Sequence, residues 1–237
     1  VQRGHPFLPV YARLSLPASL TLPVTHGVGV ERVMAKGDAY DAVVVGGGPN
    51  GLAAAITLQE KFGSVLLVES KDTIGGGTRS AERTLPGFVH DICAAVHPLG
   101  AASPFFRSID LSRYGLRWIQ LDLPLAHPFE DGSALYLDRS LENTCTVLGA
   151  DGDAYRKLVA PFVDGHEDLF ADILAPPRFP RHPRVTVRFA LKAWHSCRHL
   201  AEKTFRDART RALFAGLSAH AMVPLDSPAT AAFGIVL

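Results

Sequence analysis

The chain has 237 residues, of which 47% are hydrophobic and 20% are charged, and its formal net charge is +1. This composition is that of a globular protein, and a charge so close to zero gives no reason to expect a nucleic-acid partner. The three cysteines are isolated from one another, so the sequence excludes a disulfide scaffold and a C-x-x-C redox pair. We therefore expect a protein of a reducing compartment, the cytoplasm.

Residues 1–37 differ from the rest of the chain. Prolines at positions 6, 9, 17 and 23 interrupt each apolar stretch, and no helical or alternating period continues across them. The unbroken apolar core and small-residue cleavage site of a signal peptide are not evident. Met34, followed by a few residues and then the first expected strand, stands where a native start would lie. We predict that residues 1–37 are a disordered leader or an upstream extension.

The clearest pattern in the sequence lies between residues 40 and 69. A β-branched run at residues 43–45 leads into a G-x-G-x-x-G segment that begins at Gly46, and an alanine-rich helix is expected after it. A second apolar run, residues 65–68, ends at Glu69. Strand, glycines, helix, strand and acid in this order predict a β-α-β unit that binds a dinucleotide.

Each glycine of this segment has a mechanical role. Gly46 permits the tight turn out of the strand, Gly48 lets the backbone approach a pyrophosphate, and Gly51 lets the helix lie close to the sheet. The helix N-terminus offers N–H groups and a partial positive charge to the phosphates. Glu69, at the carboxyl end of the second strand, is expected to accept hydrogen bonds from both ribose hydroxyls of an adenosine.

A second cluster of glycines distinguishes between the dinucleotides. Gly75, Gly76 and Gly77 follow Glu69 closely, and a nicotinamide-binding domain has no need of them. The longer FAD molecule runs past the first turn, so a second backbone loop must approach its pyrophosphate and ribityl chain. We therefore predict FAD as the cofactor, held by residues of both loops and of the second strand: Gly46, Gly48, Pro49, Asn50, Gly51, Glu69, Ser70, Gly76, Gly77, Thr78 and Arg79.

These motifs, together with a G-F-x-x-D segment at residues 87–91, resemble the FAD-dependent phytoene desaturase and amine oxidase superfamily, especially its phytoene desaturase-like bacterial branch. The resemblance covers about residues 38–237. Gly77 stands where relatives usually have arginine, and Cys93 stands where they commonly have glycine. Arg79, two residues beyond Gly77, is either a substitute that reaches the pyrophosphate or a solvated surface arginine.

The resemblance implies both a fold and an activity. The fold is α/β: an incomplete Rossmann-like FAD-binding sheet in residues 38–115, joined to a truncated α+β substrate or cap domain in residues 116–237. In the superfamily the chain returns later to complete the sheet, so this sequence resembles the N-terminal half of such a protein. The implied activity is FAD-dependent oxidation or desaturation of a small hydrophobic or amine-bearing molecule, by hydride transfer to flavin. The alternative is a catalytically silent dinucleotide-binding fragment, or a subunit that needs a partner chain.

Alternating and helical patterns continue beyond the cofactor unit. Residues 116–121 predict a strand, and residues 125–137 predict a hairpin around an Asp-Gly turn. Helices are expected over residues 138–148 and from Asp151 onward, the second with an apolar face. No residue of these elements has a definable catalytic role.

Residues 178–211 carry ten lysines or arginines against two acids, whereas the rest of the chain has a net charge of −7. Apolar residues lie beside the basic ones at helical spacing. Two interpretations are open: surface helices whose charges pair with the missing C-terminal half, or a basic helix that rests peripherally on an anionic membrane. No nucleic-acid recognition motif accompanies the charge. His195 and His199 have a zinc-binding spacing, but without a third ligand the sequence predicts no metal site.

Overall fold

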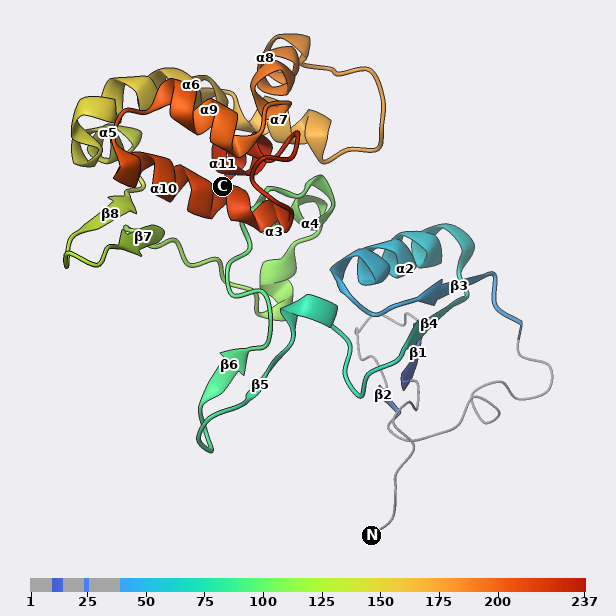
Figure 1. The fold of residues 1–237 in the computed structure, drawn as a ribbon. Coiled ribbons are helices and arrows are strands. Elements are labelled where there is room, and N and C mark those ends of the chain that lie inside the picture. Colours follow the sequence, from blue (N-terminus) through green and yellow to red (C-terminus); the bar gives the residue numbers. More distant parts are fainter. Residues whose placement is uncertain (1–9, 15–23, 26–38) are drawn as a thin grey trace. The chain divides into compact units, whose positions relative to one another are not determined.

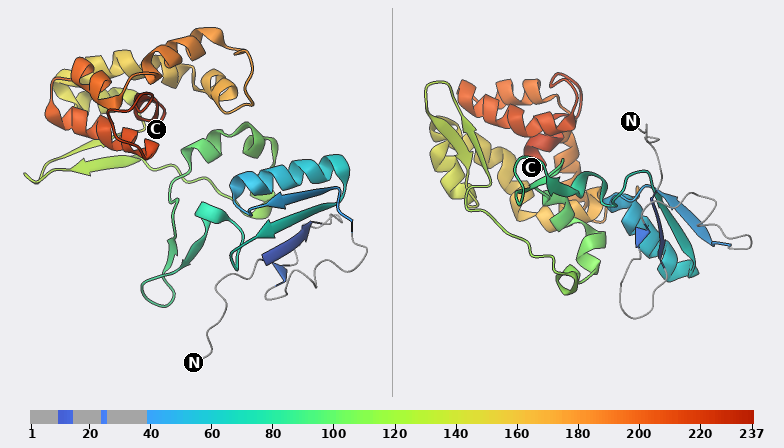
Figure 2. Two further views of the ribbon diagram at one scale, coloured as in Figure 1. Left: turned by 45° about the vertical axis from the view of Figure 1, so that its right-hand side comes forward. Right: turned by 90° about the horizontal axis from the view of Figure 1, so that it is seen from below.

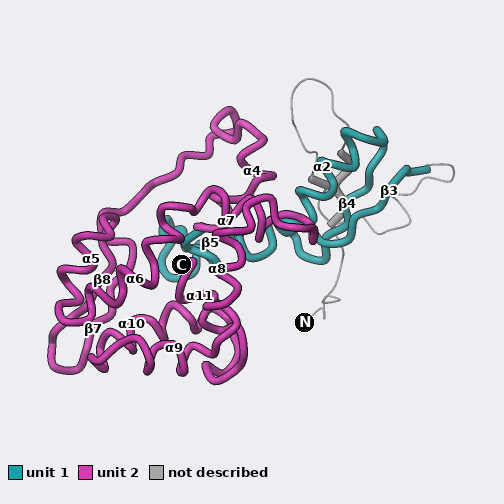
Figure 3. The backbone as a smooth tube through the Cα atoms, turned by 90° about the horizontal axis from the view of Figure 1, so that it is seen from above, with its two compact units in different colours: residues 1–97 teal, residues 98–237 magenta. Residues whose placement is uncertain are grey.

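The computed structural model describes residues 10–14, 24–25 and 39–237 (Figure 1). The chain divides into two compact units, residues 1–97 and residues 98–237 (Figure 3). The sequence suggested a boundary after residue 115, whereas the structure assigns the segment from Pro98 onward to the second unit.

The first unit is built on a sheet with the strand order β2-β1-β4-β3. β3 (Ala42–Val45) and β4 (Val65–Glu69) are parallel, and α2 (Pro49–Phe62) connects them (Figure 2). Parallel strands need such a crossover, so the predicted β-α-β unit is confirmed. β1 (Val10–Leu14) pairs antiparallel with β4, and β2 (Val24–Thr25) pairs with β1.

These last two strands fall within the predicted leader, and the rest of residues 1–37 lies outside the described residues. β1 pairs with β4 along its whole length, from Val10 opposite Glu69 to Leu14 opposite Val65. The expectation of a segment without regular structure therefore does not hold at these strands. The reason is that the backbone of β1 supplies hydrogen-bond partners for the side of β4 that β3 leaves unpaired.

Apolar residues between α2 and the sheet form the core of the first unit. Ala55 of α2 and Val65 and Leu67 of β4 are buried together. The small side chain of Ala55 keeps the helix close to the sheet. β3 ends the strand order, and its Val43 and Val45 side chains are 57% and 82% exposed.

A second glycine-containing turn and a hairpin follow β4. The turn is a short 3-10 helix, η1 (Gly76–Thr78), and the hairpin consists of β5 (Ser80–Glu82) and β6 (Val89–Asp91). The Ser80 hydroxyl donates to Asp91 Oδ1 at 2.7 Å across the two strands. The hairpin therefore continues directly from the turn that carries the second glycine cluster.

The second unit is mainly helical, with one hairpin. β7 (Leu125–Pro128) and β8 (Ala134–Leu137) are antiparallel, which confirms the hairpin predicted from the Asp-Gly pair. Gly132 in its turn has φ of 79°, a conformation that glycine adopts without a steric penalty. The helices are α3 (Pro98–Ala102), α4 (Pro104–Ser108), α5 (Leu141–Val147), α6 (Gly152–Asp164), α7 (His166–Ile173), α8 (Pro183–Ala193), α9 (Cys197–Thr204), α10 (Ala208–Ser218) and α11 (Ala231–Val236).

Two details of this unit differ from expectation. The strand predicted at residues 116–121 does not form; Trp118 and Ile119 there are 45% and 70% exposed, and no described strand lies alongside them. The helix expected from residue 138 begins at Leu141. It begins later because the Ser140 hydroxyl accepts a hydrogen bond from the backbone N–H of Asn143 and so caps the first turn.

The core of the second unit is large and partly aromatic. Phe205 and Phe214 are almost fully buried, and their ring centroids lie 5.6 Å apart. The buried carboxylate of Asp151 accepts hydrogen bonds from the backbone N–H groups of Arg206 and Asp207, at 2.9 and 2.8 Å. These bonds join the start of α6 to the start of α10. Within the part of the chain that the structure describes, no helix is long and apolar enough to cross a bilayer.

Candidate nucleotide-binding site

The first glycine turn is fixed by contacts that only glycine allows. Gly46 has φ of 102°, and its N–H donates to the Val68 carbonyl oxygen at 2.7 Å, which joins the end of β3 to β4. A Cβ atom on Gly51 would overlap the Gly46 carbonyl oxygen. Both residues are therefore glycine for reasons internal to the fold, as the sequence predicted for a turn and a close helix approach.

The second glycine loop packs directly against the first. The Gly75 N–H donates to the Gly47 carbonyl oxygen at 2.7 Å. A Cβ atom on Gly76 would lie 2.9 Å from the Cα of Gly48 and 3.7 Å from Cδ of Pro49. Two backbone segments therefore meet at the N-terminus of α2, with no side chain between them.

Gly48 differs from these neighbours, because nothing in the chain itself requires glycine there. Its φ of −75° and ψ of 176° suit any residue. A Cβ atom on Gly48 would meet only the Cα of Gly76, at an ordinary 3.8 Å. The same residue caps α2 without a side-chain hydrogen bond, so the N–H groups of the first turn have no side-chain cap. An unfilled position beside uncapped N–H groups fits a pyrophosphate.

Glu69 lies buried at the carboxyl end of β4, 8% exposed. Its Oε2 accepts from the Gly47 N–H at 2.7 Å, and its Oε1 accepts from the Lys71 N–H at 3.0 Å and the Ser70 hydroxyl at 3.2 Å. Burial alone would raise the pKa of Glu69, but these hydrogen bonds outweigh it and hold the pKa below its ordinary value. Oε1 already accepts two hydrogen bonds and Oε2 accepts one, so the ionised carboxylate keeps one acceptor position, on Oε2, for a ribose hydroxyl.

The remaining predicted residues belong to the second loop. The Thr78 hydroxyl donates to the Gly75 carbonyl oxygen at 2.7 Å, and Arg79 Nε donates to the Gly76 carbonyl oxygen at 2.9 Å. Arg79 is half-buried, so it is part of the loop rather than a fully solvated surface arginine. Among the described residues, its terminal amino groups make no hydrogen bond. Its contact with a pyrophosphate stays a prediction, as do the cofactor contacts of the other residues.

Two glycines that the sequence did not single out as cofactor-binding residues also shape the site. Gly47 is buried, and a Cβ atom there would lie 2.9 Å from Cγ2 of Ile74 and 3.1 Å from Oε2 of Glu69. Gly75 has φ of 116° and donates to Gly47. The triplets of glycine at residues 46–48 and 75–77 contained this signal, since a run of three glycines exceeds what one turn needs.

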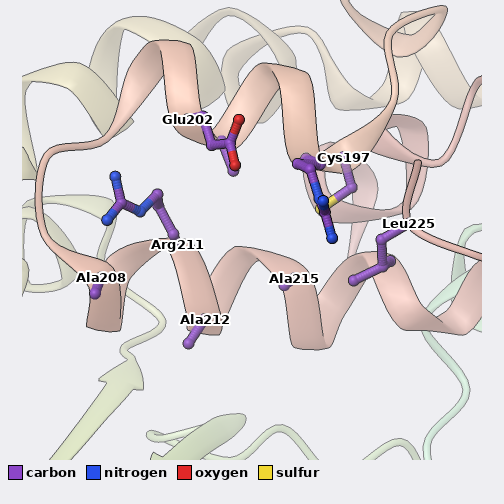
Figure 4. Close-up of a pocket in the computed structure, with 9 residues that line it drawn as sticks. Cys197, Glu202, Ala208, Arg211, Ala212, Ala215 and Leu225 are labelled. Atoms are coloured by element: carbon purple, nitrogen blue, oxygen red, sulfur yellow. The ribbon is translucent and has the colours of Figure 1, made fainter.

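The second unit contains a groove of about 520 Å³ between α9 and α10 (Figure 4). Glu202 of α9 and Arg211 of α10 lie on its two sides, and Cys197 lies at one end. Burial raises the pKa of the Cys197 thiol, which disfavours the reactive thiolate. This groove therefore lacks an activated nucleophile. Within the described residues, no group of three or more His, Cys, Asp or Glu side chains could hold a metal ion.

Comparison with known proteins identifies the first unit. Residues 44–109 match the family of NAD(P)-binding Rossmann-like domains, which confirms the predicted α/β Rossmann-like fold. The pyridine nucleotide-disulfide oxidoreductase domain-containing protein 2 of Mus musculus is 33% identical over 159 residues, covering 64% of this chain and 24% of that protein. The (S)-6-hydroxynicotine oxidase of Paenarthrobacter nicotinovorans is 41% identical over 83 residues, covering 32% of this chain and 18% of that protein.

A solved structure of wild-type putrescine oxidase bound to putrescine aligns with 82% of this chain and 40% of that chain, at 19% identity and a TM-score of 0.46. The chain thus spans about a quarter of the mouse relative and less than half of putrescine oxidase. For the chain itself, the matched segment establishes a nucleotide-binding Rossmann-like domain that contains both glycine loops.

Proposed function

We propose that the protein is an FAD-dependent oxidoreductase of the phytoene desaturase-like kind. The observation that carries the proposal is the contact between the two glycine loops at the start of α2. Gly76 lies against Gly48 so closely that only backbone fits between the loops. A dinucleotide held at the first turn would therefore meet a second backbone segment along its length, as the extended FAD molecule requires.

The residues present fit the cofactor at three points. Gly48 leaves room for a pyrophosphate beside the first turn of α2, and Glu69 offers an ionised acceptor for a ribose. Arg79 is held by its Nε on the second loop, which leaves its terminal amino groups for a phosphate oxygen. A bound flavin would supply the hydride acceptor, while these residues bind and orient it.

The proposed substrate is a small hydrophobic or amine-bearing molecule. An amine-bearing substrate is supported by the relative named as a (S)-6-hydroxynicotine oxidase, which shares 41% identity with 32% of this chain. A hydrophobic substrate follows from the resemblance of the glycine and G-F-x-x-D motifs to the phytoene desaturase-like branch. Turnover of either class by the purified protein distinguishes the two.

A pair of variants of α2 tests the cofactor assignment. Gly48→Val places a branched side chain in the position reserved for the pyrophosphate, and Ala54→Val adds the same branched side chain on an exposed position of the same helix. We expect calorimetric titration to show FAD binding in the parent and in Ala54→Val, and none in Gly48→Val, with the circular dichroism of all three alike. Undiminished FAD binding by Gly48→Val would refute the site. Tighter binding of NADH than of FAD by the parent would assign a nicotinamide cofactor instead.

A second candidate is nucleotide binding without turnover in the absence of a partner chain. It is favoured because the charged side chains of the described site, Glu69 and Arg79, are already held by hydrogen bonds to the backbone. Anaerobic mixing of the FAD-loaded protein with amines and with hydrophobic alkenes separates the candidates. Bleaching of the flavin supports the enzyme, and an unchanged flavin spectrum with every substrate supports silent binding.

A further inference from the structure

One face of α8 presents large apolar side chains to solvent. Val187, Leu191 and Trp194 follow one another at spacings of four and three residues, and they are 53%, 68% and 74% exposed. Phe179, in the connector before the helix, is 96% exposed. Residues at this spacing share one side of a helix. We call Val187, Leu191 and Trp194 the outer apolar face.

This face is additional to the one that anchors α8 in the fold. Val185 and Phe189 pack against the core of the second unit, and the Phe189 ring lies 5.7 Å from that of Phe162 in an edge-on arrangement. α8 is therefore apolar on two sides, whereas a surface helix normally has a polar outer side. Isolated exposed apolar residues need no explanation, but three large ones on one side of a helix form a patch.

The end of the helix is held firmly by backbone hydrogen bonds. The Trp194 carbonyl oxygen accepts from the Ala229 N–H at 3.1 Å, and the His195 carbonyl oxygen accepts from the Ala231 N–H at 3.3 Å. Cys197 N–H in turn donates to the buried Thr230 hydroxyl at 2.8 Å. The exposed Trp194 ring is consequently presented from a fixed backbone.

The sequence segment that carries the outer apolar face has charges of a single sign. Between Asp172 and Glu202 the sequence has no acidic residue and six cationic ones: Arg178, Arg181, Arg184, Arg188, Lys192 and Arg198. Three of these, Arg184, Arg188 and Lys192, lie exposed on α8 itself. Such long side chains can lie along apolar groups and extend their charges to an anionic layer.

Acids lie close to both ends of this segment: Arg198 pairs with Asp226 at 3.0 Å beyond the C-terminal end of α8, and two acids of α7 are engaged at its N-terminal end. Asp168 of α7 pairs with His182 at 3.2 Å. Asp172 accepts from the backbone N–H groups of Arg181 and His182 and from the Thr186 hydroxyl, all at 2.8–2.9 Å. These contacts orient the start of the helix and leave the cations of its outer side without an acidic partner among the described residues.

We propose that α8 and its connector bind the surface of an anionic lipid bilayer. Tryptophan, phenylalanine and leucine bordered by arginine and lysine are the composition of a helix that lies in the membrane interface. The apolar side chains would enter the acyl boundary, and the cations would contact anionic headgroups. The commitment to lipid rests on the charge of residues 173–201, which include six arginines or lysines and no acid.

Flotation of the whole chain with lipid vesicles tests this proposal. We expect the protein to float with vesicles of phosphatidylcholine and phosphatidylglycerol, to float poorly with pure phosphatidylcholine, and to dissociate as NaCl is raised. The sequence has two tryptophans, so Trp118→Phe leaves Trp194 as the reporter. Its emission should shift to shorter wavelength only with the anionic vesicles. No flotation, or equal flotation with both lipids, would overturn the proposal.

Matched charge variants locate the contact. Replacement of Arg184, Arg188 and Lys192 by glutamine should weaken vesicle binding at least about tenfold, since each cation near an anionic surface adds to the attraction. The control replaces three exposed arginines elsewhere in the second unit, Arg113, Arg117 and Arg139, by glutamine. Equal losses in both variants would indicate a diffuse charge effect and reject α8 as the contact.

A variant of the outer apolar face distinguishes lipid binding from self-association of the chain. Leu191→Glu alters an exposed residue, so the fold should be retained, and vesicle binding should be lost. The parent and the variant are also compared by sedimentation without lipid. If the parent self-associates and Leu191→Glu does not, a second copy of the chain covers the face, and the lipid proposal fails.

Discussion

The candidate site of the first unit and the outer apolar face of the second unit are built from different kinds of structure. Among the residues whose side chains the structure describes, the apolar cluster between α2 and the sheet contains three buried residues, whereas the apolar cluster of the second unit contains 18. The candidate site of the first unit is made largely of backbone, and Gly48 and Gly76 lie in contact there. The outer apolar face of the second is made of side chains on a helix that a large core holds in place. The spacing of glycines in the sequence predicts a site made of backbone. A surface made of side chains cannot be predicted in this way, because it depends on which side of the helix faces solvent.

The largest expected effect is on stability, and it tests whether the core of the second unit stabilises that unit alone. Phe214 is 1% exposed and packs on Phe205, so Phe214→Ala should lower the free energy of unfolding by about 4 kcal/mol. Urea unfolding followed by circular dichroism measures the loss. Phe179→Ala, at a residue that is 96% exposed, is the control and should change stability little. If FAD binding falls as much as stability in Phe214→Ala, the two units do not unfold independently.

The next effect concerns the first unit, where α2 lies close to the glycine turn that follows β3. A Cβ atom on Gly51 has no room beside the Gly46 carbonyl oxygen, so Gly51→Ala should destabilise this unit by about 3 kcal/mol. Hydrogen exchange of the α2 amides reports the local loss. Gly48→Ala is the matched control, because its Cβ would lie at an ordinary 3.8 Å from the nearest atom. Equal exchange rates in the two variants would show that the helix approach does not depend on Gly51.

Raising the pH above 10 should lower the stability of the second unit, because Tyr155 is buried there. Burial raises the pKa of Tyr155 to about 12 from its ordinary 10.0, because the buried phenol resists ionisation. The unfolded phenol ionises near pH 10 while the folded one stays neutral, so stability falls as the pH rises from 10 toward 12, by about 2–3 kcal/mol. Tyr155→Phe has no phenol to ionise and should flatten this part of the profile. An unchanged alkaline profile in Tyr155→Phe would contradict the assignment.

The sequence predicted the parts of the fold that short-range chemistry determines. The β-α-β unit followed from glycine spacing, and the β7–β8 hairpin followed from one Asp-Gly pair. The strand expected at residues 116–121 failed because a strand needs a partner, and alternation alone does not supply one. The contact of Gly76 with Gly48 joins a residue before α2 to a residue after β4, so it depends on how the whole crossover folds and could not be predicted from the local sequence. Likewise, the sequence showed that residues 178–211 are basic and apolar, but only the packing of Val185 and Phe189 shows which side of α8 faces solvent.

The smallest expected effect separates the two roles of Glu69. Its carboxylate holds the N–H groups of Gly47 and Lys71, so Glu69→Ala leaves two donors without their partner and should destabilise the first unit by about 1–3 kcal/mol. FAD affinity should fall by a similar amount if the carboxylate also accepts from the ribose. Glu60→Ala, on an exposed position of α2, is the control and should change neither quantity.

The stability of the first unit should also fall at acid pH, because Glu69 must be ionised to hold the glycine turn. The pKa of Glu69 in the folded chain lies below its ordinary 4.5, so the carboxylate stabilises the fold fully above pH 4.5. As the pH falls below 4.5 and through the lower folded value, protonation removes the acceptor of Gly47, and this contribution is lost. Glu69→Gln, which cannot titrate, should show a flatter acid profile than the parent when α2 hydrogen exchange is followed. Parallel acid profiles would mean that the carboxylate does not hold the glycine turn, and that the turn is maintained by the backbone bonds from Gly46 to Val68 and from Gly75 to Gly47 alone.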